Sequence, residues 1–253
     1  MKILLPDNIY AKIFFSLLPG FTEAEIIYSK SAVISKELDE DKADIALIPS
    51  MDILSHPAFY ISGKAAISFD GAVSNSYFYF IKQLRFVKEL FLRGDVSKNE
   101  VILSKIIFEE QFDSTPEIFL DSKEFSLNEK NYLICGNENF TDNLLDAGFS
   151  LADQIADMLE APYVNYVLAS KNEQIIKNLN TKIADLDKML EDNFEAVSKN
   201  LNVGEHVLSF VRDNLNSLYF DMTEIERKSF ADLIQLAYFA GIIEDIPDIK
   251  LID

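Results

Sequence analysis

DKADIALIPSMDILSHPAFYISGKAAISFDGAVSNSYFYF, residues 41–80, contains the apolar runs from which the rest of the chain can be interpreted. The run Ile45–Ile48 predicts a buried strand that ends at the turn Pro49-Ser50. Two further apolar strands follow, separated by a break at Asp70-Gly71 and by small or polar residues as far as Ser76. In an open parallel sheet, ligands bind at the carboxyl ends of strands. We therefore expect these polar strand ends to face each other across one crevice, which is the predicted functional site.

The N-terminal part of the chain alternates between short apolar runs and segments with helical periodicity. This alternation predicts a parallel sheet with right-handed crossover connections. The first helix has Asp7 or Asn8 as its expected N-cap and stops at Pro19-Gly20. The expected elements are a strand at Lys2–Leu5, a helix at Tyr10–Leu18, a strand at Ala24–Tyr28 and a helix at Ser31–Glu40.

The rest of the chain continues the alternation and then becomes helical. We expect helical structure throughout from Lys171, with Ile175–Leu190 packing on a core. The alternative is that Ile175–Leu190 forms an intermolecular helix pair. This run is shorter than the three or four heptads typical of a coiled coil. The expected elements are strands from Phe86–Leu92, Pro116–Leu120, Asn131–Cys135 and Tyr163–Leu168, a helix at Val101–Phe108 capped by Asp95 or Ser97, and a helix or helix pair at Thr141–Leu159 interrupted near Gly148.

Composition excludes several classes of function. The 253 residues include 23 Lys+Arg and 42 Asp+Glu, a formal net charge of −19. Nucleic-acid binding requires basic clusters that neutralise phosphates, and anionic membranes also attract basic segments, so neither is an expected partner. One cysteine, Cys135, excludes an intramolecular disulfide and a multi-cysteine metal site.

Neither a metal nor an export signal is expected. His56 and His206 are the two histidines, and His56 has no His or Cys neighbour at metal-ligand spacing. No apolar run reaches the length of about twenty residues that spans a bilayer. Pro6-Asp7-Asn8 interrupts the N-terminal apolar run after three residues, which is too short for a secretion signal, so we expect a cytoplasmic protein.

Several segments, in this order, resemble the chorismate dehydratase family of the futalosine route to menaquinone. They are DIALIPS at 44–50 followed by Gly71-x-Val73, Tyr132–Asn137, Ala161–Val167, and Tyr219–Arg227 leading to Ala240–Ile243. The resemblance implies an α/β, two-lobed fold of the type II periplasmic-binding-protein kind, in which each lobe is a mostly parallel sheet flanked by helices and the C-terminal segment is helical. It implies that residues 1–84 and 169–253 form lobe 1, and that residues 85–168 form lobe 2.

The resemblance also implies a lyase that removes water from chorismate and leaves an aromatic enol ether of benzoate. Such an enzyme needs hydrogen-bond donors that hold a dianion and a site that excludes water, and no cofactor or metal is expected. The expected partner is a small chorismate-like carboxylate, and the protein is expected to be a monomer or homodimer. The expected ligand-binding residues are Asn8, Ser50, Gly71, Ser74, Asn75, Ser76, Ser97, Lys98, Asn99, Gly136 and Asn137.

Three of these positions depart from the family pattern. Asn75 stands where the family has Ser, the family's Ser-Arg-Thr-Ser helix start is Ser97-Lys98-Asn99-Glu100, and its Gly-Asp pair is Gly136-Asn137. Glu100 would repel a dianion unless it points away from the ligand. No catalytic residue is assigned, and each polar residue can equally be a helix cap or turn residue. Two alternatives therefore stay open: a non-catalytic carboxylate-binding protein of the same fold, or an acidic interaction protein.

Overall fold

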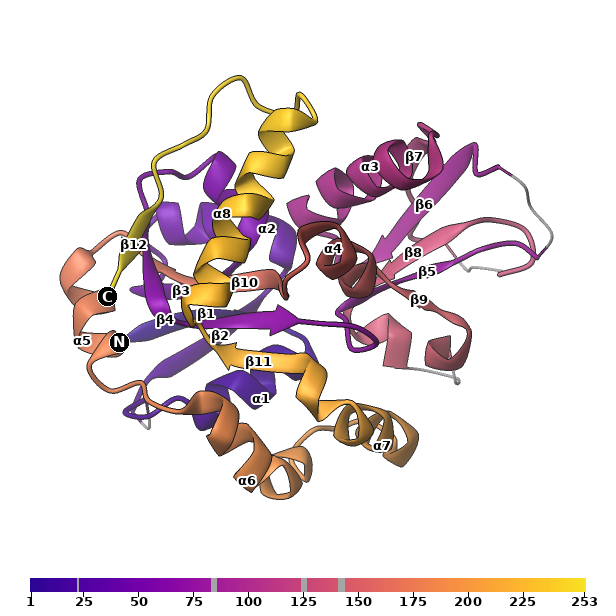
Figure 1. The fold of residues 1–253 in the computed structure, drawn as a ribbon. Helices are drawn as coiled ribbons and strands as arrows, with labels where there is room; N and C mark the ends of the chain where they lie inside the picture. The colour runs from indigo at the N-terminus through magenta and orange to yellow at the C-terminus, as the bar shows by residue number, and fades with distance from the viewer. Residues whose placement is uncertain (22, 83–85, 124–126, 141–143) are drawn as a thin grey trace.

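The computed structural model describes residues 1–21, 23–82, 86–123, 127–140 and 144–253. The chain forms two lobes, each built on its own β-sheet and flanked by helices (Figure 1). The lobe that contains both termini is larger, and we call it lobe 1 with sheet A; the other is lobe 2 with sheet B. The α/β, two-sheet architecture predicted from the sequence is confirmed.

Sheet A has the strand order β11-β4-β10-β3-β1-β2, and β12 also pairs with β4. β1 pairs in parallel with both β2 and β3, as the alternation of strands and helices predicts. β10 lies between β3 and β4, antiparallel to both, and every one of its residues is buried. The strands are β1 (Lys2–Pro6), β2 (Glu25–Ser29), β3 (Ile45–Pro49), β4 (Tyr60–Phe69), β10 (Tyr163–Ser170), β11 (Leu218–Asp221) and β12 (Lys250–Ile252).

Helices cover both faces of sheet A. In the view of Figure 1, α1 and α6 lie below the sheet, and α2 and α8 lie above it. Contacts of α2 with β3, of α8 with β10 and of α6 with β11 bury the apolar faces of these helices. Their bounds are α1 (Ile9–Leu17), α2 (Ser31–Asp39), α5 (Glu173–Asn180), α6 (Leu186–Ser198), α7 (Glu205–Asp213) and α8 (Glu224–Phe239), with short 3₁₀ turns η1 (Ser50–Leu54) and η4 (Leu215–Ser217).

The expectation of helical structure throughout from Lys171 is wrong at two places, because β11 and β12 are strands of sheet A. In β11, Leu218 and Phe220 are buried while Tyr219 and Asp221 are half-buried, which is the two-residue period of a strand. Pairing with β4 stabilises this short segment, and four residues are too few for periodicity to reveal it among helices. The run Ile175–Leu190 is split between α5 and α6.

Sheet B has the strand order β7-β6-β8-β5-β9; α4 packs on β5 and β9, and Phe108 of α3 packs against Phe78 of β5. Thr141–Leu159 is not one helix: a 3₁₀ turn and β9 precede α4, and 141–143 lie outside the described residues. The elements are β5 (Ser76–Tyr79), β6 (Glu89–Gly94), α3 (Lys98–Phe112), β7 (Glu117–Leu120), β8 (Tyr132–Cys135), η2 (Gly136–Phe140), η3 (Leu144–Ala147), β9 (Phe149–Ser150) and α4 (Leu151–Leu159).

The chain passes from one sheet to the other twice. It leaves sheet A after β4 and enters sheet B at β5, and it returns to sheet A at β10. The changes of sheet therefore fall between Phe69 and Ser76 and between α4 and Tyr163, ahead of the lobe boundaries expected after residues 84 and 168. Both sheets are mixed rather than mostly parallel, because strands that arrive from the other lobe pair antiparallel with their neighbours. Among the described residues, no helix combines the length and apolar character needed to span a membrane.

The packing of α8 on β10 gives a test of this architecture. Leu233 is fully buried at this contact, whereas Ile225, on the same helix, is 61% exposed. Leu233→Ala leaves a cavity in a close-packed core, and we expect it to lower the free energy of unfolding by about 2–5 kcal/mol. Ile225→Ala should change it by less than about 0.5 kcal/mol. Urea denaturation measures both, and equal effects would contradict the described packing.

Candidate functional site

Where the lobes meet, the hydroxyl of Tyr166 joins polar side chains from segments far apart in the sequence. It lies 3.4 Å from Nδ2 of Asn8, 3.2 Å from Nδ2 of Asn75 and 3.1 Å from Oγ of Ser31. Ser31 Oγ donates its proton to Asp95, so the Tyr166 hydroxyl must donate to Ser31 and accept from the two amides. We call Asn8, Ser31, Asn75, Asp95 and Tyr166 the interlobe network.

Each of the five members of the network comes from a different segment of the chain. Asn8 is the N-cap of α1, and its Oδ1 accepts from the backbone N–H of Ala11 at 2.8 Å, which leaves Nδ2 to point toward Tyr166. Asn75 lies in the crossing segment just before β5, and its carbonyl accepts from the N–H of Gly136 at 2.7 Å. Tyr166 lies on β10, and burial raises the pKa of its hydroxyl well above the usual value, with the carboxylates of Glu100 and Asp95 adding to the shift. The Tyr166 hydroxyl is therefore un-ionised and acts as a donor.

Asp95 of lobe 2 contacts the N-terminus of α2 in lobe 1. Its carboxylate accepts from the backbone N–H of Ser31 at 3.0 Å and from Ser31 Oγ at 2.7 Å. Ser31 is the first residue of α2, where free N–H groups and the helix dipole favour a negative charge. The N-terminus of α2 is therefore a carboxylate-binding position at the junction between the lobes, and the carboxylate of Asp95 occupies it.

A second set of contacts attaches the start of α3 to lobe 1. Oδ1 of Asn99 accepts from the N–H of Met51 at 2.8 Å and lies 3.5 Å from Ser50 Oγ, while Nδ2 donates to the carbonyl of Asn165 at 2.7 Å. Asn99 thus joins α3 to η1 and to β10. The predicted convergence of the loops that carry Ser50, Asn75 and Asn99 is present, in the form of direct contacts between the lobes.

Glu100 points into the protein rather than toward solvent. Its carboxylate accepts from Ser97 N and Oγ at 2.8 and 2.6 Å, forming the capping box of α3, and from Ser76 Oγ at 2.9 Å. Burial raises the pKa of Glu100, and the hydrogen bonds from Ser97 and Ser76 oppose the shift. Hydroxyl and amide donors, rather than a cation, hold this carboxylate.

Two amide oxygens beside these contacts have no hydrogen-bond partner among the described residues: Oδ1 of Asn75 and Oδ1 of Asn165. Both side chains are fully buried or nearly so, and both use Nδ2 to donate to a tyrosine hydroxyl. A buried acceptor without a partner is costly, and such atoms are uncommon in native structures. Each of these oxygens can accept a hydrogen bond from a donor that the described residues do not supply.

The other predicted site residues lie at varying distances from this centre. Ser74 is buried and ties the crossing segment to α4, because its Oγ accepts from the N–H of Ala152 at 3.3 Å. Gly136 makes a turn with a φ of +72° beside Asn75, and Gly71, with a φ of +92°, faces Ser217 near β11 instead. The backbone conformation favours glycine at both positions.

Asn137 and Lys98 lie outside the network. Asn137 is exposed, and its Nδ2 donates to the carbonyl of Asp7 at 2.7 Å. Lys98 reaches Ser55 of lobe 1, with 2.5 Å between Nζ and Oγ. Sequence reasoning missed Ser31 and Tyr166 as site residues and treated Asp95 only as a helix cap; the position of Asp95 directly after β6 was the available signal, because strand ends hold functional groups.

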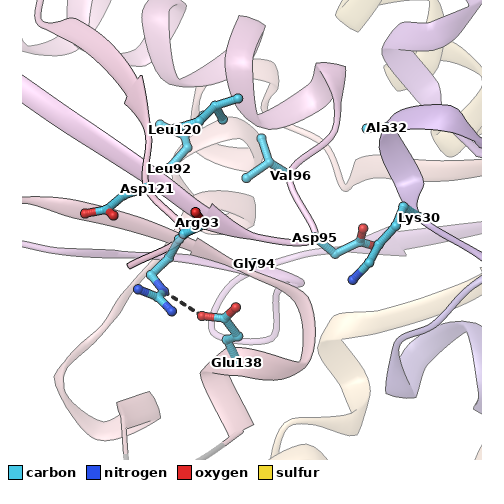
Figure 2. Close-up of a pocket in the computed structure, with 11 residues that line it drawn as sticks. Lys30, Ala32, Leu92, Arg93, Gly94, Asp95, Val96, Leu120, Asp121 and Glu138 are labelled. Carbon is cyan, nitrogen blue, oxygen red and sulfur yellow. Dashed lines mark hydrogen bonds and ion pairs between the residues drawn. The ribbon is translucent and has the colours of Figure 1, made fainter. Parts of the chain in front are cut away.

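A cavity of about 370 Å³ opens beside Asp95 at the junction of the lobes (Figure 2). Lys30 and Ala32 line it from lobe 1, and Arg93, Asp121 and Glu138 are among the residues that line it from lobe 2. Nε of Arg93 lies 2.6 Å from Glu138. The hydrogen bond from Lys130 lowers the pKa of Asp121 to about 2. The charges that line this cavity are therefore largely engaged with one another or with nearby groups.

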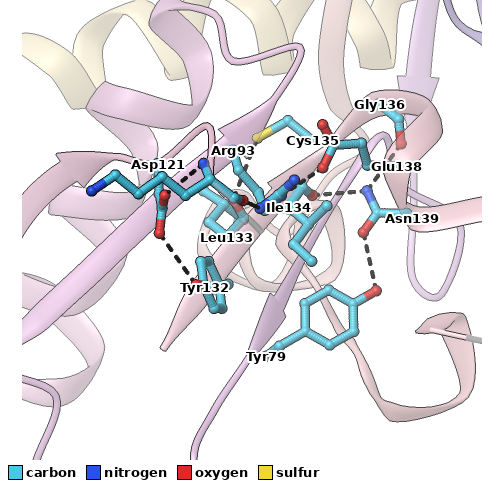
Figure 3. Close-up of polar contacts among 11 residues, drawn as sticks. Tyr79, Arg93, Asp121, Tyr132, Leu133, Ile134, Cys135, Gly136, Glu138 and Asn139 are labelled. Atoms are coloured by element: carbon cyan, nitrogen blue, oxygen red, sulfur yellow. Dashed lines mark hydrogen bonds and ion pairs between the residues drawn. The ribbon is translucent and has the colours of Figure 1, made fainter. Parts of the chain in front are cut away.

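The wall of lobe 2 behind this cavity is held by Asn139 (Figure 3). Its Nδ2 donates to the carbonyls of Ile134 and Gly136 at 2.8 and 3.1 Å, and its Oδ1 accepts from the hydroxyl of Tyr79 at 3.0 Å. Cys135 is buried beside it, and burial raises the pKa of the thiol well above its usual value, with the carboxylate of Glu100 adding to the shift. The thiol is therefore protonated and unreactive. The described residues contain no group of three His, Cys, Asp or Glu side chains able to hold a metal.

No family model and no curated protein matches this sequence. Solved structures do match the fold. The crystal structure of protein AF1704 from Archaeoglobus fulgidus matches with a TM-score of 0.71 and 12% identity, covering 96% of this chain and 98% of that chain. The crystal structure of an ABC transporter from Parabacteroides distasonis matches with a TM-score of 0.66 and 11% identity, covering 100% and 98%.

A third solved structure that matches has a named fold. The CA3427 gene product of Candida albicans, reported to have the generic periplasmic binding protein fold, matches with a TM-score of 0.60 and 10% identity, covering 97% of this chain and 91% of that chain. Identities this low show the fold alone. The chain has the periplasmic-binding-protein-like fold that the sequence predicts.

The hydrogen bonds of Tyr166 give a direct test of the network. Tyr166→Phe leaves Asn8 and Asn75 without an acceptor and Ser31 without a donor, and we expect the free energy of unfolding to fall by about 2–3 kcal/mol. Tyr163→Phe is the matched control, since its hydroxyl lies outside the network and accepts from Asn165, on the same strand, at 3.2 Å. That change should cost about 1 kcal/mol. Chemical denaturation compares them, and an equal loss would count against the network.

The buried carboxyl of Glu100 predicts a pH dependence. Its pKa in the folded chain is raised, so the stability this group contributes is complete below its unfolded pKa, about 4.3, and is lost as the pH rises through the folded value. Glu100→Gln cannot ionise, and its unfolding free energy relative to the unmodified chain should rise from pH 4 to pH 8. Glu226→Gln makes the same replacement at the N3 position of the capping box of α8 and controls for the exchange of a capping carboxyl for an amide. A pH-independent difference for Glu100→Gln would refute the assignment.

Proposed function

We propose that this protein binds a small cyclic carboxylate of the chorismate type between its two lobes, and that it is a chorismate-dehydratase-like lyase in menaquinone biosynthesis. One observation carries the proposal: the carboxylate of Asp95 is held by Ser31 N and Oγ at the N-terminus of α2. Asp95 belongs to lobe 2 and Ser31 to lobe 1, so an opening of the lobes separates them. The carboxylate-binding position at the N-terminus of α2 is then available for the carboxylate of a ligand.

The unpaired acceptor of Asn75 supports a ligand that also carries a hydroxyl. Oδ1 of Asn75 has no partner among the described residues, while Nδ2 of the same side chain contacts Tyr166, which also contacts Ser31. The carboxylate-binding position at Ser31 and the Oδ1 acceptor of Asn75 therefore belong to one connected set of side chains. Chorismate carries carboxylates and a hydroxyl, so it supplies both the anion and the donor that these groups lack.

Dehydration to an aromatic product needs little from the protein beyond binding, orientation and exclusion of water, because aromatisation provides the driving force. In this account, Ser31 and the N-terminus of α2 hold a carboxylate, and Asn75 orients the hydroxyl that leaves. Closure of the lobes buries these groups, since Asn8, Ser31 and Asn75 are all fully buried. No side chain is assigned a proton-transfer role.

Non-catalytic binding of the same ligand is the second candidate function. Asn75 occupies a position where the resemblance implies Ser, and its Nδ2 already contacts Tyr166. Glu100 also occupies a position where a hydroxyl is implied, and it adds a buried carboxyl within reach of the junction. Both differences leave a binding site in place while they change the groups that would assist proton transfer.

Chorismate separates the two functions. We expect the purified protein to bind it in calorimetry and to deplete it with formation of the benzoate enol ether, detected by chromatography. Ser31→Ala and Asn75→Ala should each weaken binding at least about tenfold by removing a hydrogen bond to a charged or buried group. Asn180→Ala is the control, because this buried amide contacts Ser62 and Ile252 far from the junction.

The outcomes lead to different conclusions. Binding without turnover supports the non-catalytic protein. Absence of binding to chorismate and to benzoate, or equal affinity in the Ser31, Asn75 and Asn180 variants, would overturn the proposed site.

A further inference from the structure

A second cavity, of about 400 Å³, adjoins the one beside Asp95. Residues of α2 and of the segment around η1 line it from lobe 1, and the start of α3 and the end of β7 line it from lobe 2. Ala32, Val96 and Leu120 contribute to both cavities. The volume of the second cavity is within the range of cavities that bind small molecules, about 300–1,000 Å³.

The charges that line this second cavity are mainly positive, although the chain as a whole carries −19. The ionisable side chains that line it are Lys36, Asp52, His56 and Lys98. Asp52 is buried and accepts from Ser35 Oγ; burial raises its pKa, and Lys98 and His56 act in the opposite direction. Even with Asp52 ionised, the two lysines leave an excess of positive charge.

The lysines are weakly engaged. Lys98 contacts the neutral Ser55 hydroxyl and, within the described residues, forms no ion pair. Lys36 has an exposed partner, Glu40, at 3.8 Å, a pair of the kind that contributes little. The cavity beside Asp95 differs, because Lys30 and Arg93 there are matched by Asp95, Asp121 and Glu138. The second cavity therefore has an excess of positive charge, whereas the charges around the first are matched by one another.

Apolar side chains form the rest of the second cavity. Val96 and Val101 of the α3 segment and Leu120 of β7 lie on the lobe 2 side. Leu120 is 77% exposed, so an apolar group placed against it would remove its side chain from water. Cations beside an apolar surface match a molecule with a charged head and an apolar body.

We propose that this cavity is a binding site for a small amphiphilic organic anion, whose carboxylate contacts Lys36 and Lys98 and whose apolar part covers Val96, Val101 and Leu120. Residues of both lobes line the site, so an occupant stabilises their closed arrangement. None of Asn8, Ser31, Asn75, Asp95 and Tyr166 lines it, and the proposal does not depend on the proposed function.

Hexanoate, with acetate as its short counterpart, tests the site in the full-length protein. We expect calorimetry to show saturable binding of hexanoate at one site, with at least about tenfold lower affinity for acetate because fewer methylene groups are buried. Lys36→Gln combined with Lys98→Gln should weaken hexanoate binding about tenfold or more. Lys105→Gln combined with Lys199→Gln makes the same change in net charge at two exposed lysines outside the cavity, and should leave the affinity unchanged.

Asn75→Ala separates this site from the interlobe network. Unchanged hexanoate affinity in Asn75→Ala, together with loss in the Lys36/Lys98 variant, supports the proposal whether or not chorismate binds. Loss in Asn75→Ala with no loss in the lysine variant would place hexanoate at the network and overturn the proposal. Equal losses in the two double-lysine variants, or no binding of hexanoate to the unmodified protein, would also overturn it.

Discussion

The junction of the two lobes depends on the need of buried polar groups for hydrogen-bond partners. Every member of the interlobe network except Asp95 is fully or almost fully buried, and the Tyr166 hydroxyl serves three of them. One donor and two acceptor positions of a phenol match one serine oxygen and two amide groups, so a single arrangement satisfies the set. Because the network joins residues of lobe 1 to Asn75 in the crossing segment and to Asp95 of lobe 2, this local requirement fixes how the lobes meet.

Asp95 joins the two lobes and Glu100 is buried within lobe 2, and among the described residues neither carboxylate forms an ion pair. Asp95 is bound by a helix N-terminus and a serine, and Glu100 by serine hydroxyls and a backbone amide. Donors of this kind bind a carboxylate without adding a positive charge, and the same groups can bind the carboxylate of a ligand. In a chain with a net charge of −19, local donors decide where an anion binds, because remote charges are screened by salt.

Apolar periodicity predicted most of the strands and helices, and the family resemblance implied the two lobes. The segments around Ile45–Pro49 and Tyr163–Ser170 are long apolar runs whose burial on both faces makes them strands in almost any packing. β11 and β12 were missed because four and three residues carry too little pattern, and pairing with β4 decides their structure. The departure of Asn75 and Glu100 from the family pattern was visible in the sequence, but their partners were not.

The candidate site shows the same division between local and tertiary information. Asn8, Ser50, Asn75 and Asn99 could be placed near one another because each lies at the end of a strand or at the start of a helix. Tyr166 joins Asn8 to Asn75, and Asp95 occupies the carboxylate-binding position at Ser31. Both contacts are consequences of how the two sheets meet, which no local sequence pattern encodes. Lys98 was predicted as a ligand-binding residue of the junction, and its side chain instead lines the cavity beside α2.

The central claim is that this chain's own polar contacts hold the lobes closed in the absence of a ligand. The distance between spin labels at Lys105→Cys on α3 and Lys177→Cys on α5, measured by pulsed electron resonance, tests it most directly, since the native Cys135 is buried. The account predicts one narrow distribution for the ligand-free protein, and a broader, longer one when Tyr166→Phe is added. A broad distribution in the ligand-free protein that does not respond to Tyr166→Phe would contradict the claim.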